Sequence, residues 1–141
     1  MTGKPKVVTL GVAGEDHQVV RVEGARGEYR RRPCAPCPWR RDNVGEFPAE
    51  AFRLAAPGTA YDMSDATFGC HESDAMRTQT CAGFLLSTTA DNNLSVRLGQ
   101  SSGRLVLDDV HGDGAVLFAY FADMAIANGV DPDDPVLALC V

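Results

Sequence analysis

The pattern of apolar and polar positions predicts two short strands near the N-terminus. Residues 6–12 and 18–23 are rich in β-branched side chains, and the turn formers Gly14 and Asp16 lie between them. Such residues favour strands, and a short polar link between two runs is typical of a hairpin. We therefore expect an N-terminal β-hairpin, which residues 28–32 could extend as a third strand.

Two later stretches have the pattern of helices. Residues 48–56 consist mostly of helix formers after a leading proline, and the helix should end before Pro57. Residues 114–128 carry a broad apolar face at helical spacing. Asp113 is placed to cap the first amides of this helix, and Gly129 can supply the left-handed residue after its end.

The remaining apolar segments are short. Alternation over residues 94–98 and the apolar run 104–107 each predict a strand, whereas residues 82–86 fit either a helical turn or a strand. Residues 59–80 have little periodicity. The expected fold class is α+β, in a single domain over residues 1–141 with an N-terminal β-hairpin, further short strands and a C-terminal amphipathic helix around a metal site.

The composition is that of a globular protein, with 45% hydrophobic and 23% charged residues. No apolar run is long enough to cross a bilayer, and the N-terminus lacks the apolar centre of a secretory signal. We therefore expect a cytoplasmic protein without membrane contact. Residues 1–53 carry ten Lys and Arg against seven Asp and Glu, but the net charge of −6 disfavours binding along an extended polyanion.

The cysteines carry the chemistry in this sequence. Cys34 and Cys37 have the two-residue spacing that lets two thiolates converge on one metal. Cys70 and Cys81 bring the number to four, which is the number required by a tetrahedral zinc or a four-iron cluster. In a reducing compartment, clustered thiols are more often ligands than disulfides. Cys140 is the odd cysteine.

The cysteine spacing does not decide which metal is bound. We favour an iron–sulfur cluster bound by Cys34, Cys37, Cys70 and Cys81, because a proline follows Cys37 and only one close cysteine pair is present. Zinc is the alternative, and His71 could then replace one cysteine. Arg40 and Arg41 could offset thiolate charge, and Trp39 could shield the site or simply pack in the core.

Two enzymatic interpretations compete with the metal module. Pro33 to Cys37 together with Cys70 to Glu72 matches the two halves of zinc-dependent deaminases in reversed order, with Glu72 as a possible general base. Cys34 and Cys37 could also form a redox dithiol. The deaminase order would require a permuted fold and the dithiol leaves two cysteines unexplained, so we expect a protein that is not an enzyme.

Several motifs together resemble an uncharacterised protein family of actinobacteria and their phages. They are Cys-Ala-Pro-Cys-Pro-Trp-Arg from Cys34, Phe-Gly-Cys-His from Phe68, Cys-Ala-Gly-Phe from Cys81, and the stretches 93–97 and 127–131. The resemblance spans roughly residues 30–140, implies that the cysteine motifs belong together, and brings no activity with it. The WhiB-type iron–sulfur regulators are a looser analogy, because they use four cysteines at other spacings and bind a transcription factor.

The sequence therefore predicts a small regulatory or protein-interaction module that binds an iron–sulfur cluster through four cysteines. A zinc-stabilised module that binds protein or nucleic acid is the alternative, and a deaminase-like hydrolase ranks below both. The expected partner is a protein. A local nucleic-acid contact would use the arginines that surround the first cysteine pair, Arg30, Arg31, Arg32, Arg40 and Arg41.

Overall fold

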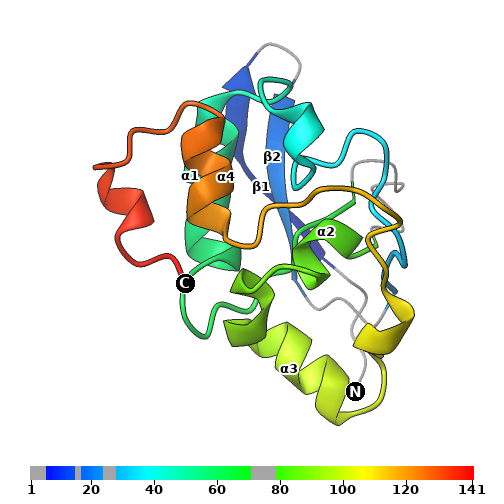
Figure 1. The fold of residues 1–141 in the computed structure, drawn as a ribbon. Coiled ribbons are helices and arrows are strands. Elements are labelled where there is room, and N and C mark those ends of the chain that lie inside the picture. The colour runs from blue at the N-terminus through cyan, green and yellow to red at the C-terminus, as the bar shows by residue number, and fades with distance from the viewer. Residues whose placement is uncertain (1–5, 15–16, 24–27, 71–78) are drawn as a thin grey trace.

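The computed structural model describes four stretches of the chain, residues 6–14, 17–23, 28–70 and 79–141. In the first two, strands β1 (Lys6–Gly14) and β2 (His17–Glu23) pair antiparallel, with Lys6 opposite Glu23. The turn between them, residues 15–16, lies outside the described residues. Helix α1 (Ala49–Thr59) lies beside both strands (Figure 1).

The rest of the described chain is built from short helices joined by irregular segments (Figure 1). The α-helices after α1 are α2 (Ala82–Leu85), α3 (Leu94–Ser101) and α4 (Phe121–Ala127). The 3-10 helices are η1 (Arg41–Asn43), η3 (Thr89–Asn92), η4 (Leu107–Asp109) and η5 (Pro135–Leu137). None of the helices described is long and apolar enough to cross a bilayer.

The predicted α+β class, built from an N-terminal β-hairpin and further short strands, is wrong as a description of the fold: β1 and β2 pair antiparallel, but no strand follows them in the described residues. Residues 28–70 and 79–141 contain isolated bridges and no strand, so helices dominate the part of the chain that holds the core. Residues 28–32 form no third strand, only a bridge between Tyr29 and Thr80, and residues 104–107 form no strand. Val96 and Leu105, from the segments predicted as strands, are buried by tertiary contacts, which routinely override local propensity, whereas Leu98 and Val106 are exposed.

The segment 94–98, predicted as a strand, lies in α3. Asn93 caps this helix, because its side-chain oxygen accepts the Val96 N–H at 3.1 Å. The Asn93 side chain is 1% exposed and its amide also donates to the Ala66 carbonyl at 2.8 Å. Alternating apolar residues over five positions fit a helix as well as a strand, and the capping asparagine decides between them.

The predicted C-terminal helix is shorter than expected. It begins at Phe121 rather than near Asp113, because residues 116–118 pair through their backbone groups with residues 39–41, just after the Cys-x-x-Cys segment. Its end is as predicted. Gly129 has φ +105°, and the Gly129 and Val130 amides donate to the Ile126 and Ala125 carbonyls, which is the Schellman pattern.

Helix α1 is longer than predicted. It begins after Pro48, as expected, but continues through Pro57 to Thr59. A proline near the end of a helix removes one N–H bond and clashes with the carbonyl four residues earlier. Phe52 and Ala56, on this helix, are nevertheless buried in the core, so packing outweighs that cost.

Aromatic side chains form the centre of the core. Trp39, Phe84 and Phe121 are each fully buried, and the Trp39 ring centroid lies 6.1 Å from those of Phe84 and Phe121. Phe68 packs edge-on against Trp39 at 5.8 Å. Trp39 is therefore a core residue that joins four separate segments of the chain.

Replacing Asn93 by alanine should destabilise the fold by about 2–3 kcal/mol, because α3 loses its cap and the buried Ala66 carbonyl loses its donor. Urea denaturation would measure the change. Asn92→Ala is the matched control, since its backbone carbonyl, which accepts the Met63 N–H, is kept. Equal effects of the two substitutions would contradict the capping role.

Candidate metal centre

The first cysteine pair lies in two consecutive tight turns. The Cys37 N–H donates to the Cys34 carbonyl at 3.2 Å, and the Arg40 N–H donates to the Cys37 carbonyl at 3.1 Å. The side-chain amide of Asn43 donates to the Ala35 and Cys37 carbonyls, both at 2.8 Å. These bonds hold the loop so that both sulfurs turn inward, and Cys34 and Cys37 are 5% and 0% exposed.

The third cysteine meets this loop directly. Cys37 Sγ and Cys81 Sγ lie 3.6 Å apart, and Cys81 is 1% exposed at the start of α2. The approach is possible because position 83 is glycine. A Cβ on Gly83 would lie 2.7 Å from Trp39 Cβ and 2.8 Å from Cys37 Sγ, far inside contact distance.

Cys70 reaches the same region through backbone pairing. Its N–H donates to the Gln79 carbonyl at 2.8 Å, and the Cys81 N–H donates to the Phe68 carbonyl at 2.7 Å. These bonds flank an antiparallel bridge between Gly69 and Thr80. The segments that carry Cys70 and Cys81 therefore run side by side, and both side chains are buried in one core cluster with Cys34 and Cys37.

The contact with Cys81 and burial raise the pKa of the Cys37 thiol. A hydrogen bond with the Cys34 side chain lowers the pKa of Cys37, but its contact with Cys81, burial and charge on Cys81 together raise it to about 12. The Trp39 backbone N–H donates to the Cys37 sulfur and lowers the pKa again. The raised pKa makes the Cys37 thiol itself a poor nucleophile.

Positive charge lies next to the loop. The Arg40 guanidinium donates to both carboxylate oxygens of Asp42 at 3.1 Å, and charge on Cys37 and Cys34 also contributes, after Asp42, to its raised pKa. Arg40 therefore lies within electrostatic reach of both sulfurs. Arg41 instead stacks over the Phe118 ring at 4.3 Å.

The predicted site residues divide into three groups. Cys34, Cys37, Cys70 and Cys81 share one buried cluster, and all five cysteines of the chain carry thiols rather than disulfides. His71 and Glu72 lie outside the described residues. Cys140 is half-buried elsewhere, in a bridge with Tyr61. Within the described stretches, no three His, Cys, Asp or Glu side chains are already placed around a metal-sized centre.

Sequence reasoning assigned no role to Gly83 or Asn43. Gly83 appears in the sequence only as part of a Cys-Ala-Gly motif, and its role becomes visible when Cys37 and Trp39 are found against it. Asn43 looks like an ordinary loop residue, although it donates twice to the loop that carries the first cysteine pair. Both depend on contacts that no sequence pattern specifies.

The comparisons place the cysteine cluster within one family. The family of unknown function DUF6283 matches residues 29–141, which include all four clustered cysteines, Trp39 and Gly83. The chain belongs to DUF6283. No curated protein and no solved structure gives a match. The matched region begins after β2, so the paired strands precede the family's part of the chain.

Gly83→Ala should destabilise the protein by about 1–3 kcal/mol and move Cys37 away from Cys81, because the new methyl group overlaps both Trp39 and Cys37. Thermal denaturation and metal content would measure these two effects. Gly112→Ala is the matched control, since its Cβ would approach nothing closer than 3.8 Å. A Gly83→Ala protein as stable as this control would show that the close approach is not needed.

Proposed function

We propose that this DUF6283 protein is a small metal-stabilised interaction module whose Cys34, Cys37, Cys70 and Cys81 bind one metal centre. The supporting observation is the buried Cys37–Cys81 pair, with sulfur atoms 3.6 Å apart. A tetrahedral zinc with Zn–S bonds of about 2.3 Å places its sulfurs about 3.8 Å apart. The pair thus has nearly the separation of two ligands on a single ion.

The surroundings of the pair also suit thiolate ligands. The backbone N–H of Trp39 already donates to the Cys37 sulfur, and such outer hydrogen bonds orient ligands and stabilise their charge. Arg40 supplies positive charge nearby. In the proposed site Cys34, which already contacts Cys37, and Cys70, from the adjacent backbone, turn toward the pair and complete four ligands.

We favour zinc over an iron–sulfur cluster for this geometry. In a four-iron cluster each cysteine binds a different iron, so two ligand sulfurs need not be near neighbours. A two-iron cluster also places two thiolates on one iron and is the alternative occupant. Either centre needs deprotonated cysteines, so binding must release the proton that burial holds on Cys37.

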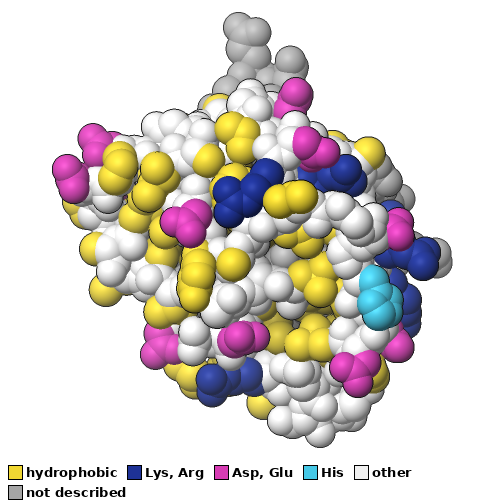
Figure 2. Space-filling model, viewed as in Figure 1, with side chains coloured by type: hydrophobic (Ala, Val, Ile, Leu, Met, Phe, Trp, Pro, Cys, Tyr) yellow, Lys and Arg dark blue, Asp and Glu magenta, His cyan; other side chains and the backbone are white. Residues whose placement is uncertain are grey.

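The metal would serve folding rather than catalysis in this proposal. Four protein ligands leave no open coordination position, which is typical of structural zinc sites. A module of this kind acts through its surface. Large apolar side chains stand exposed on the described chain, Val116 at 67% and Leu139 at 66%, and Figure 2 shows apolar side chains gathered across one face. We propose a protein partner and a reducing, cytoplasmic location that keeps the thiols available.

Nucleic acid is the second candidate partner, through Arg30, Arg31, Arg32, Arg40 and Arg41. Arg31 lies over the Tyr29 ring, while Arg32 and Asp113 form a long, highly exposed ion pair at 3.9 Å. Because Arg40 and Arg41 are engaged with Asp42 and Phe118, Arg32 is the more available of these cations. Binding that is absent or insensitive to salt would exclude this use.

Anaerobic purification followed by metal and sulfide analysis tests the proposal directly. We expect one zinc per chain, no acid-labile sulfide and no colour, and cobalt substitution should give the absorption of a tetrahedral thiolate site. Iron with stoichiometric sulfide would show that the centre is an iron–sulfur cluster and not zinc. A folded protein that is free of metal after purification in metal-containing medium would overturn both the zinc and the cluster assignment.

Cys34→Ser and Cys70→Ser should each lose bound metal and unfold at lower urea concentration, because a structural metal contributes its binding free energy to folding. Cys140→Ser is the control and should keep full metal content, with stability changed by no more than about 0.5 kcal/mol. Full metal content in all four Cys→Ser variants of the cluster would refute the ligand assignment.

A further inference from the structure

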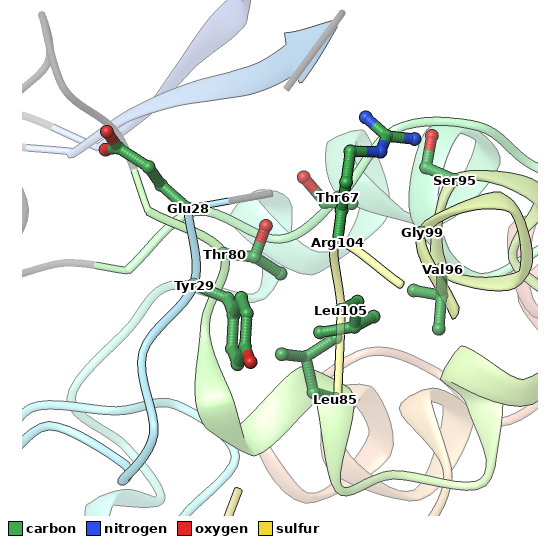
Figure 3. Close-up of a pocket in the computed structure, with 10 residues that line it drawn as sticks. All are labelled: Glu28, Tyr29, Thr67, Thr80, Leu85, Ser95, Val96, Gly99, Arg104 and Leu105. Atoms are coloured by element: carbon green, nitrogen blue, oxygen red, sulfur yellow. The ribbon is translucent and has the colours of Figure 1, made fainter. Parts of the chain in front are cut away.

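A pocket lies beside the bridge between Tyr29 and Thr80, and both residues line it. Its walls come from the segment after β2, from α2, and from α3 with the residues that follow it (Figure 3). The side chains of Tyr29, Leu85 and Leu105 form an apolar floor, and each is less than 9% exposed. None of the four clustered cysteines lines this pocket, so it is separate from the metal centre.

Polar groups surround this floor. Thr67 and Thr80 line the pocket and are 7% and 8% exposed. Each hydroxyl can donate one hydrogen bond and accept others. Both hydroxyls can therefore bond polar atoms of a ligand that enters the pocket.

Opposite charges stand on opposite sides of the pocket. Figure 3 shows the Glu28 carboxylate on one side and the Arg104 guanidinium on the other. Arg104 Nε donates to the Ser102 hydroxyl at 2.9 Å. Among the described residues, neither Glu28 nor Arg104 forms an ion pair, and both are exposed to an entering molecule.

We propose that this pocket binds a small zwitterion of the amino-acid class, with a hydrocarbon chain between its ammonium and carboxylate groups. The guanidinium of Arg104 pairs with the carboxylate, for which its planar donors are suited. Glu28 pairs with the ammonium group. The hydrocarbon part covers the floor, and the hydroxyls of Thr67 and Thr80 bond the polar groups that reach them.

The experiment uses the full chain as purified, labelled with ¹⁵N, and three probes with the same carbon chain. They are 6-aminohexanoate with both charges, hexanoate with the carboxylate alone, and hexylamine with the ammonium alone. We expect saturable shifts of the Thr80, Leu85 and Leu105 amide signals, with 6-aminohexanoate binding about tenfold more tightly than either relative.

Variants assign each charge. Glu28→Gln should abolish the preference for 6-aminohexanoate over hexanoate. Arg104→Gln should abolish the preference for 6-aminohexanoate over hexylamine. Arg97→Gln is the matched control, because Arg97 is another exposed arginine whose Nε donates locally, to the Asp91 carbonyl, and it does not line the pocket. An Arg97→Gln effect equal to that of Arg104→Gln would overturn the assignment of the carboxylate to Arg104. Binding of hexanoate as tight as that of 6-aminohexanoate would overturn the proposal, and so would the absence of any saturable shift.

Discussion

The close contact between helix α2 and the Cys-x-x-Cys loop is the constraint on which the rest of this structure depends. Gly83 presents bare backbone to Trp39 and to the Cys37 sulfur, at distances that no side chain would allow. This contact brings together two segments that are more than forty residues apart in the sequence. Trp39 extends it, because its ring packs against Phe68, Phe84 and Phe121.

Backbone hydrogen bonds then hold the neighbouring segments in place. The Phe118 N–H donates to the Trp39 carbonyl, and the Arg41 N–H donates to the Val116 carbonyl, so residues 116–118 run along the loop. On the other side, residues 68–70 pair with residues 79–81. Backbone hydrogen bonds therefore fix the segments that carry Cys37, Cys70 and Cys81 relative to their neighbours.

Helix α2 connects the two sites. Cys81 lies at its start, among the four buried cysteines, whereas Leu85 at its end lines the separate ligand pocket. The helix has only four residues, so a displacement at one site would be transmitted to the other through very little chain. The proposed metal would therefore stabilise the wall of the proposed ligand pocket.

The sequence by itself determined which cysteines are candidate ligands, where α1 begins and where α4 ends. Four thiols at ligand spacing are visible without a structure, and so are Gly129 as a helix end and residues 48–56 as a helix, because these depend on local chemistry. Tertiary structure alone decided the fold class and the geometry. Residues 94–98 are helical because Asn93 caps α3, and residues 116–118 pair with residues 39–41 instead of forming a helix. The distance from Cys37 to Cys81 depends on Gly83, whose role appears only when distant segments meet.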